Sequence, residues 1–382
     1  MQTDFDYIIC GGGCSGLSLA VRLSKSEKLK NKKVLIIEKE IKNSNDRTWC
    51  FWEKEENYFE KLLFKKWKEA SFIDTYGKLD LHLKPYQYKM IRSTDFYHYC
   101  HTEIKKNSNF HFVQEKITSI NADNICTVQT ENAVYTSSYL FDSTKPEFIN
   151  DPKSHFLLQH FKGVFIETSS DFFDENCATL MDFSIDQGGD CRFFYLLPFS
   201  KRKALVEYTI FSEKELDKES EYDTEIEKYL HQKLGTVKYF TQETEKGIIP
   251  MTNAPVIQTK SKLHIKIGTA GGLTKASSGY TFLFIQRDSE RILKDLENDK
   301  MPYTYKPSKK FMLFDAVLLN ILRFKKLEAR SIFSGLFRKN KCENVLAFLN
   351  NESNIGIDLK IMSSVNKSVF LPAAIQEIRY SF

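Results

Sequence analysis

Near its N-terminus the chain has the sequence Asp6-Tyr-Ile-Ile-Cys-Gly-Gly-Gly-Cys-Ser-Gly-Leu-Ser-Leu-Ala20. The apolar run before the glycines predicts a buried parallel strand, and Gly11, Gly13 and Gly16 then have the spacing G-x-G-x-x-G. In this pattern the first glycine permits a tight turn, the second lets the backbone approach a pyrophosphate, and the third lets a helix pack against the strand. We therefore expect a dinucleotide-binding turn, with phosphates at the N-terminus of a helix over about residues 15–24.

The surroundings of this motif strengthen the prediction. A second strand is expected at residues 33–38, and Glu38 lies 22 residues after Gly16. An acidic side chain at the end of that strand can accept hydrogen bonds from ribose hydroxyls. A glycine-rich loop alone is a weak indication, but here the strand, the helix, the second strand and the acid all follow one another. A motif so close to the N-terminus is usual for FAD enzymes, although it does not exclude NAD.

A second glycine-rich junction between a strand and a helix favours FAD. It follows a strand predicted to begin at His264 and precedes a helix predicted to end near Glu297. Its glycines, which we assign to cofactor binding, are Gly268, Gly271, Gly272 and Gly279. The N-terminus of the helix can stabilise negative charge on a reduced flavin. Asp142 ends another buried strand, and ligands of α/β sheets gather outside such carboxyl ends, so Asp142 is also assigned to the cofactor site.

The pattern between residues 159 and 211 is different. Four short β-rich segments with turns between them predict an antiparallel sheet, inserted as a second lobe into an α/β dinucleotide-binding domain. We expect the dinucleotide-binding domain at residues 1–60, 85–150 and 245–298, the substrate lobe at residues 60–85 and 151–244, and a helical, membrane-associating region at residues 299–382.

Composition limits the function classes. With 55 basic and 50 acidic residues, the net charge of +5 is too small to indicate nucleic-acid binding. The 31 Phe and 18 Tyr suit either a large core or a cavity for a long apolar or conjugated ligand, and composition does not separate the two. The eight cysteines are scattered without a C-x-x-C pair, and no signal peptide precedes Asp4, so reduced thiols in the cytoplasm are expected and no metal site is predicted.

One segment bears on membrane association. No run approaches the ~20 apolar residues that span a bilayer. In a helix over residues 311–324, however, Asp315, Asn320 and Arg323 fall in one sector and the remaining surface is apolar. Both a helix lying in the interface of an anionic membrane and a core helix followed by cations have this pattern.

Six segments together resemble the flavin-dependent lycopene cyclase family of carotenoid synthesis, in its bacterial β-cyclase branch. In chain order they are Gly11-Gly-Gly-Cys-Ser-Gly16, Arg47-Thr-Trp-Cys-Phe-Trp52, Met90-Ile-Arg-Ser-Thr-Asp-Phe96, Leu196-Leu-Pro-Phe-Ser200 with Leu205-Val-Glu-Tyr-Thr209, Gly247-Ile-Ile-Pro-Met251, and Gly268-Thr-Ala-Gly-Gly-Leu-Thr-Lys275. The resemblance implies an FAD-binding Rossmann-like fold, similar to that of glutathione-reductase-type and aromatic-hydroxylase-type flavoproteins.

The resemblance also implies the chemistry. An acyclic ψ-end of lycopene is protonated, the tertiary cation is attacked by the neighbouring double bond, and loss of a ring proton leaves a β-ionone ring. Two such reactions convert lycopene through γ-carotene to β-carotene with no net redox change, while NAD(P)H keeps FAD in its reduced, anionic form. The implied location is peripheral, on the cytoplasmic face of a membrane. A rival prediction is an FAD-dependent monooxygenase or an isoprenoid reductase with an apolar substrate.

Glu207 matches the first acid of the family's Glu-rich motif and is the predicted catalytic residue. Its role as acid, base or charge stabiliser stays open, and its neighbours Leu205 and Thr209 do not settle which face of the strand is buried. The second acid of the plant motif is replaced by Tyr208 here. A two-carboxylate mechanism therefore needs a substitute, for which the candidates are Asp142, Asp182 and Asp186.

Aromatic residues are expected around the carotenoid, because their faces attract a cation. The residues predicted to line the substrate pocket are Trp49, Phe51, Trp52 and Tyr208. Arg92 matches the family pattern next to Asp95 and is assigned to the cofactor site.

Overall fold

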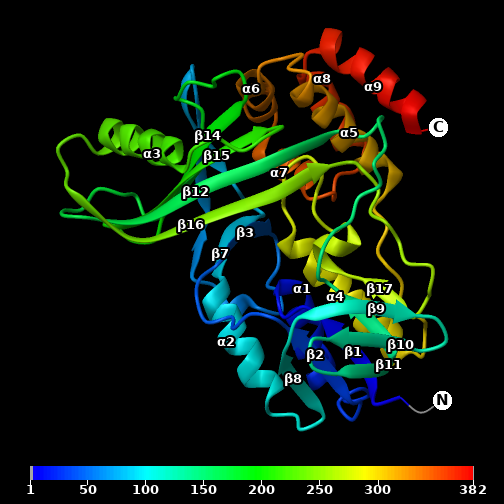
Figure 1. Ribbon diagram of the computed structural model, residues 1–382. Coiled ribbons are helices and arrows are strands. Elements are labelled where there is room, and N and C mark those ends of the chain that lie inside the picture. The colour runs from blue at the N-terminus through cyan, green and yellow to red at the C-terminus, as the bar shows by residue number, and fades with distance from the viewer. Residues whose placement is uncertain (1–2, 382) are drawn as a thin grey trace.

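The structure, a computed structural model, describes residues 3–381 (Figure 1). A mainly parallel sheet in the lower lobe of Figure 1 has the strand order β8-β2-β1-β11-β10-β9, with β17 also paired to β11. Its strands are β1 (Phe5–Cys10), β2 (Val34–Glu38), β8 (Phe110–Gln114), β9 (Ile117–Ala122), β10 (Cys126–Thr130), β11 (Val134–Asp142) and β17 (His264–Lys266). The central strands are almost continuously apolar because helices and strands cover both of their faces.

Three helices pack around this sheet. They are α1 (Cys14–Lys25), α2 (Ser93–Ile104) and α4 (Phe282–Glu297), and α1 contacts both of the others. Every residue of α1 from Ser15 to Ser24 is buried, because the helix lies beneath its neighbours as well as against the sheet. The N-terminus of α1 therefore has a fixed position directly after β1.

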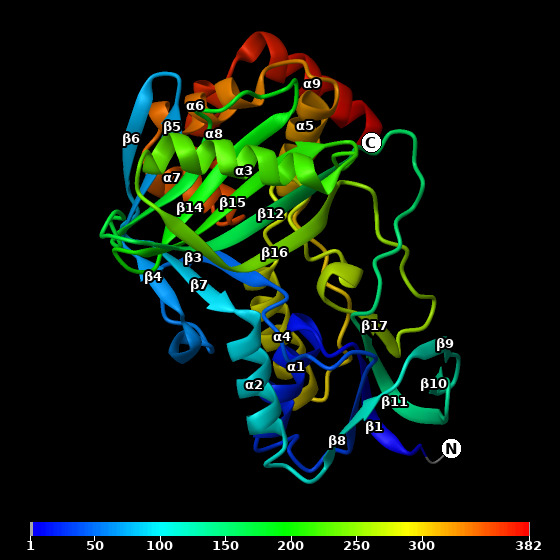
Figure 2. The same cartoon turned by 60° about the vertical axis from the view of Figure 1, so that its left-hand side comes forward.

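The second lobe is built on a sheet of strand order β16-β12-β15-β14-β13-β5-β6. The strands are β5 (Glu69–Asp74), β6 (Gly77–His82), β12 (Phe156–Thr168), β13 (Cys177–Asp182), β14 (Cys191–Pro198), β15 (Lys203–Ser212) and β16 (Tyr239–Thr252). Helix α3 (Glu219–Leu234) covers one face of this sheet (Figure 2). The sheet continues past the predicted domain boundary at residue 245, because β16 stays paired with β12 as far as Thr252.

A small sheet lies between the two lobes. It consists of β3 (Thr48–Glu53), β4 (Lys65–Trp67) and β7 (Gln87–Arg92), with β7 in the middle and both pairings antiparallel. The aromatic segment that begins at Arg47 is thus a strand over most of its length, since its β-branched and aromatic residues favour pleated pairing with β7. There are two short 3₁₀ helices in the described chain: η1 (Glu60–Leu62) lies between β3 and β4, and η2 (Gly268–Gly271) follows β17.

The last part of the described chain is helical, as predicted. The helices are α5 (Lys309–Arg323), α6 (Ala329–Lys339), α7 (Cys342–Leu349), α8 (Ile355–Ser364) and α9 (Lys367–Ser381). They lie at the end of the molecule opposite the nucleotide sheet (Figure 2). Within residues 3–381, no helix combines the length and apolarity that crossing a membrane would need.

The structure decides between the two interpretations of residues 311–324 in favour of a core helix. Helix α5 packs against α9, β12 and β16, and the polar residues Asp315 and Asn320 point inward rather than to solvent. Asp315 binds the Lys275 ammonium at 2.7 Å and the Ser277 hydroxyl at 2.6 Å, while the Asn320 amide donates to Glu377 at 2.6 Å. The polar sector is buried because it has these partners, so α5 is a core helix.

The ion pair between Lys275 and Asp315 gives a test of how the helical region is attached. The Lys275 side chain is 2% exposed, so Asp315→Ala leaves a buried ammonium without its carboxylate, and we expect a loss of about 3–5 kcal/mol in the free energy of unfolding. Urea denaturation measures this loss. The matched control is Glu290→Ala, which breaks an exposed pair with Lys294 and is expected to leave the midpoint unchanged. Equal midpoints for the two variants would contradict the structure.

Candidate active site

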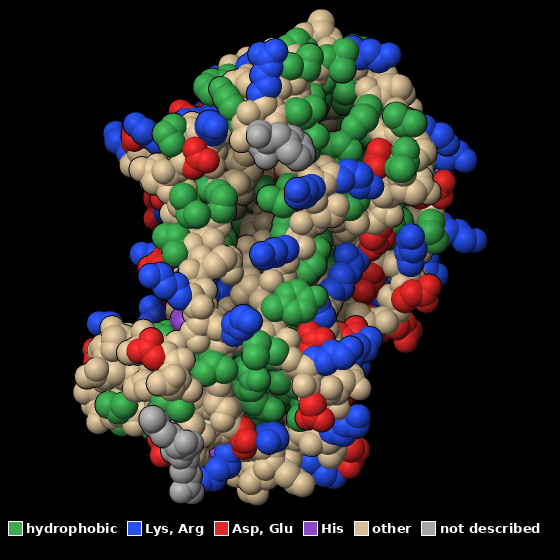
Figure 3. All heavy atoms as spheres, turned by 90° about the vertical axis from the view of Figure 1, so that its right-hand side faces the viewer, with side chains coloured by type: hydrophobic (Ala, Val, Ile, Leu, Met, Phe, Trp, Pro, Cys, Tyr) green, Lys and Arg blue, Asp and Glu red, His purple; other side chains and the backbone are tan. Residues whose placement is uncertain are grey.

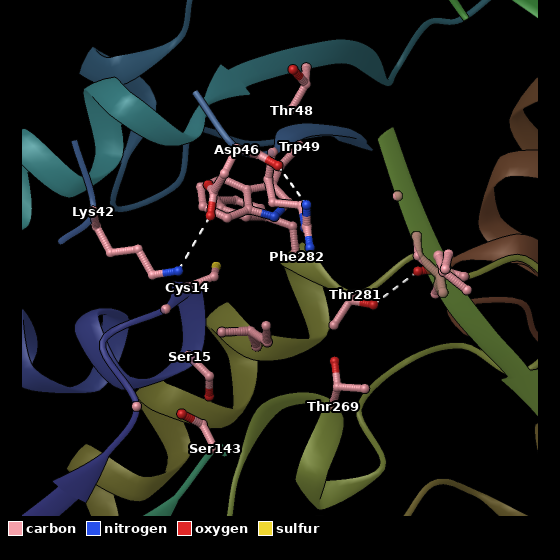
Figure 4. A pocket seen from close by; sticks show the side chains of 18 of the residues that line it. Cys14, Ser15, Lys42, Asp46, Thr48, Trp49, Ser143, Thr269, Thr281 and Phe282 are labelled. Atoms are coloured by element: carbon pink, nitrogen blue, oxygen red, sulfur yellow. Dashed lines mark hydrogen bonds and ion pairs between the residues drawn. The ribbon is translucent and has the colours of Figure 1, made fainter. Parts of the chain in front are cut away.

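A single cavity of about 860 Å³ extends from the N-terminal glycine loop to the inner face of the second sheet. At the loop end, side chains from α1, from the segment after β11, from η2 and from the start of α4 surround one space (Figure 4). At the other end lie Glu207 of β15 and an apolar, aromatic wall. The residues of that wall include Phe161, Tyr195, Leu197, Leu205, Ile249 and Tyr280. A polar ligand held by the loop therefore shares one chamber with an apolar ligand.

The loop has the geometry that its spacing predicts. Gly11 has φ +101°, a left-handed conformation that favours glycine, and its backbone follows β1 directly. A Cβ at Gly16 would collide with the carbonyl oxygen of Gly11, so this glycine allows α1 to lie close to β1. A Cβ at Gly13 would meet no protein atom within 4 Å, because that position borders the cavity. The free space at Gly13 is the room that a pyrophosphate needs.

The other predicted nucleotide residues fall into two groups. Glu38 lines the cavity and accepts a hydrogen bond from the Gly12 amide at 2.7 Å, which places its carboxylate at the end of β2 beside the loop. Gly279 also lines the cavity. Asp142 lies behind the wall, bonded to His264 at 3.1 Å, and the residues that follow it reach the cavity. In η2 it is Thr269 that faces the cavity, while its glycines form the turn: Gly268, Gly271 and Gly272.

Arg92 is not placed on the cavity. Its guanidinium forms two hydrogen bonds with Asp95, at 2.8 and 3.1 Å, and lies 4.3 Å from the centre of the Phe64 ring. These contacts hold the start of α2 against the small sheet. They correct the assignment of Arg92 to the cofactor site, because no atom of its side chain faces the ligand space.

Of the four predicted pocket aromatics, the structure brings Trp49 alone to the cavity, where its ring stacks near Phe282 with centroids 5.8 Å apart (Figure 4). Phe51 is buried on Phe282 with ring centroids 4.5 Å apart. Trp52 is buried and donates its indole N–H to the carbonyl of Leu346 at 3.0 Å. Phe51 and Trp52 are therefore core residues, because each face of β3 packs against a different hydrophobic cluster.

Tyr208 and Glu207 lie on opposite faces of β15, as neighbours in a strand must. Tyr208 is fully buried beneath α3, where it stacks on Phe194 with centroids 4.9 Å apart. Its prediction as a pocket residue is wrong for this reason. Glu207 lines the cavity, and the Thr209 hydroxyl donates to its Oε1 at 2.7 Å. The alternative of a solvent-facing Glu207 is thereby excluded.

A second carboxylate, Glu245 of β16, lies beside Glu207. It is 7% exposed, and the Thr48 hydroxyl donates to its Oε2 at 2.6 Å. Burial raises the pKa of both carboxyls, and repulsion from Glu245 raises the pKa of Glu207 further. The two side chains also share a hydrogen bond. A protonated carboxyl near neutral pH is what this pair can supply to the cavity.

The residues proposed as substitutes for a second acid lie elsewhere. Asp182 accepts a hydrogen bond from Tyr229 at 2.9 Å and pairs with Lys233, both on α3. Asp186 is exposed, and Asp142 lies behind the cavity wall, where it is bonded to His264. Glu245 was missed from the sequence because its closeness to Glu207 depends on strand pairing. The signal that could have found it is its position two residues before Gly247, in the same strand as the Gly247–Met251 segment.

Comparison with known proteins places this architecture. A family model described as lycopene cyclase protein matches residues 6–369, so the chain belongs to the lycopene cyclase family. A search of curated proteins found no match.

Several solved structures have the same fold. A flavoprotein/dehydrogenase from Cytophaga hutchinsonii aligns with a TM-score of 0.63 and 10% identity, covering 98% of this chain and 99% of its own. A geranylgeranyl bacteriochlorophyll reductase-like protein from Thermoplasma acidophilum aligns with a TM-score of 0.57 and 11% identity, covering 98% of this chain and 95% of its own. The p-nitrophenol 4-monooxygenase from Pseudomonas putida aligns with a TM-score of 0.56 and 12% identity, covering 98% of each chain. These similarities confirm the predicted fold class.

The free space at Gly13 gives a direct test of the loop. Gly13 has φ −85°, which any residue adopts, so Gly13→Val is expected to fold normally but to place its side chain where FAD would lie. We expect the flavin content of the purified variant to fall at least about tenfold, with an unchanged circular dichroism spectrum. Gly335→Ala, in α6 and far from the loop, is the control and should keep its flavin. Full flavin content in Gly13→Val would contradict the proposed position of the pyrophosphate.

Proposed function

We propose that the protein is a lycopene β-cyclase of the bacterial branch, which converts lycopene through γ-carotene to β-carotene without net redox change. One observation carries the proposal: a half-buried carboxyl of raised pKa, Glu207, lies at the apolar end of a cavity whose other end is a dinucleotide-binding loop. Membership of the lycopene cyclase family supports a carotenoid substrate.

The polar end of the cavity fits FAD. The space at Gly13 and the N-terminus of α1 suit the pyrophosphate, Glu38 suits a ribose, and the start of α4 near Gly279 suits the flavin ring. The flavoproteins with the same fold support this choice over NAD. When bound in its reduced form, with NAD(P)H as the external reductant, FAD supplies a fixed negative charge beside the apolar chamber.

Glu207 is the proton donor in this proposal. Its carboxyl gives a proton to one carbon of the terminal double bond of the ψ-end, and the π electrons form the new C–H bond. The adjacent tertiary cation is attacked by the neighbouring double bond, which closes the ring. A ring carbon then loses a proton, and the ionised Glu207 is the available base. The substrate gains one proton and loses one, so no electrons are transferred.

The wall around Glu207 suits a cation. Aromatic and aliphatic side chains exclude water, which would otherwise capture the cation, and the ring faces add attraction worth about 2 kcal/mol when desolvated. The rings of Tyr195 and Tyr280 belong to this wall, and the ring of Trp49 lines the same cavity.

The rival function is an FAD-dependent monooxygenase or an isoprenoid reductase, because both kinds of protein share the fold. The product mass separates them. Cyclisation leaves the product isobaric with lycopene, a monooxygenase adds oxygen, and a reductase adds two hydrogens.

Expression in lycopene-accumulating bacteria tests the function. We expect cyclic products isobaric with lycopene, and we expect Glu207→Gln to retain flavin but to lose at least about 100-fold in rate, because an amide cannot donate the proton. Chromatography and mass spectrometry of the pigments measure both outcomes. The control is Glu213→Gln, an exposed carboxylate just beyond β15. Undiminished ring formation by Glu207→Gln would sink the assigned role, and an oxygenated or reduced pigment would favour the rival.

We also propose that the protein binds the membrane that stores its substrate, through α8 and α9. Both helices expose apolar residues at a spacing of four and then three: Ile355, Leu359 and Met362 on α8, and Leu371, Ile375 and Ile378 on α9. Hydrophobic side chains gather at this end of the molecule (Figure 3).

The charges on these helices suit an anionic bilayer. Among their described side chains the exposed charged residues are Lys360, Lys367 and Arg379, whereas Asp358 and Glu377 are buried. An apolar stripe flanked by cations is typical of helices that lie in the membrane interface. This surface replaces α5 as the proposed membrane contact.

Vesicle sedimentation tests this surface. Leu371 and Ile375 are 59% and 53% exposed, so the double variant Leu371→Glu/Ile375→Glu is expected to fold and to lose most binding to anionic phospholipid vesicles. Val134→Glu/Phe240→Glu carries the same added charge at exposed apolar positions elsewhere and is expected to bind like the parent. Equal binding by the two double variants would refute the assignment.

A further inference from the structure

We propose that Glu245 is the proton-sharing partner of Glu207: the two carboxyls hold one proton between them across Gly163, and Glu245 keeps that proton on the member that faces the substrate. Glu245 is a positioning residue in this scheme, since Glu207 lines the cavity and Glu245 lies behind it. The inference rests on the proposed function for its catalytic meaning, but the shared proton itself is a property of the protein without substrate.

Strand pairing brings the two carboxyls together. Strand β12 runs between β15 and β16, and Gly163 on β12 is paired directly with Glu207 on one side and with Glu245 on the other. Directly paired residues project from the same face of a sheet. The three positions therefore form a row across the strands, with the carboxyl-bearing residues at its ends.

The glycine in the middle of the row leaves the space that the pair uses. Neighbouring strands lie about 4.8 Å apart, so two glutamate side chains can reach each other across one empty position. A Cβ at Gly163 would come within 2.9 Å of Leu205 Cδ1 and 3.1 Å of Glu245 Cγ. Any larger residue would stand between Glu207 and Glu245 or displace one of them.

The hydrogen bonds and charges around the two carboxyls differ, and the difference decides which of them carries the proton. Glu245 accepts a hydrogen bond from Thr48, and the positive charge of Arg47 lowers its pKa, so both favour its ionised form. Glu207 has the Thr209 hydroxyl on one oxygen, and no lysine or arginine within residues 3–381 lowers its pKa. The ionised member is therefore Glu245, and the protonated member is Glu207.

The other titratable groups around the pair leave it to titrate as a unit. Around Glu207 these are Cys50 on β3, Tyr195 on β14 and Tyr280, and burial raises the pKa of each, so they stay neutral near pH 7. Around Glu245 the charged neighbours are Arg47 and the exposed Glu243. Burial and mutual repulsion raise the pKa of the pair, so its shared proton is present at neutral pH and is lost as the pH rises.

Replacing Glu245 by glutamine tests whether its negative charge keeps the proton on Glu207. In Glu245→Gln the neighbouring negative charge is absent, so Glu207 loses its proton at a lower pH. We expect the alkaline limb of the kcat–pH profile to move to lower pH by about 1 unit or more, with KM unchanged. Glu213→Gln, which removes an exposed carboxylate just beyond β15, is the matched control and should leave the limb in place.

A second variant guards against misfolding of the first. Gly163→Ala keeps both carboxyls but forces them apart, so its alkaline limb is expected to move in the same direction. Flavin content and the urea midpoint identify any variant that has lost its fold. If both folded variants keep the parent profile, Glu245 does not govern the proton on Glu207 and the inference is overturned.

Infrared spectroscopy of the FAD-loaded enzyme without carotenoid separates this inference from the proposed function. The parent is expected to show a protonated-carboxyl band at neutral pH that disappears in Glu207→Gln and titrates at lower pH in Glu245→Gln. Absence of that band in the parent would refute the shared proton, whatever the enzyme does with lycopene. Presence of the band without cyclic products would instead count against the proposed reaction.

Discussion

The face of β15 that turns toward the cavity is the constraint on which the site depends. Because side chains alternate along a strand, Glu207 points into the cavity and Tyr208 points to the opposite face of the sheet. Tyr208, which replaces the second acid of the motif, is therefore part of the core under α3. The carboxylate that stands beside Glu207 then has to come from another strand. Because β12 pairs along its length with both β15 and β16, that residue is Glu245, and the missing side chain at Gly163 gives it access.

Local sequence was enough for elements whose signals are local. The loop at Gly11–Gly16 and the acid at Glu38 were both predicted, because tight turns and buried strands leave their pattern in a few consecutive residues. The division into a nucleotide sheet and an antiparallel sheet also followed from such patterns. The boundary near residue 245 did not, since the length of β16 is set by its partner β12.

What sequence could not give depends on contacts between distant segments. Trp49 and Phe51 lie two residues apart on β3, yet Trp49 borders the cavity and Phe51 is in the core, because Phe282 and α4 approach the strand from another part of the chain. The pattern of α5 fitted both an interfacial helix and a core helix, and only the buried contacts of its polar residues with Lys275 and Glu377 decide for the core. Glu207 and Glu245 become neighbours through a register that neither segment encodes by itself.

The ion pair of Asp315 with Lys275 has a wider consequence for the architecture. Lys275 and Ser277 open the loop that carries Ser278, Gly279 and Tyr280 to the wall of the chamber, and the carboxylate that fixes this loop comes from α5. Helix α5 of the C-terminal region thus stabilises the wall of the cavity and does not merely cover it. If these helices were exchanged between relatives as a module, the cavity wall would lose the Asp315 contacts that hold its loop in place.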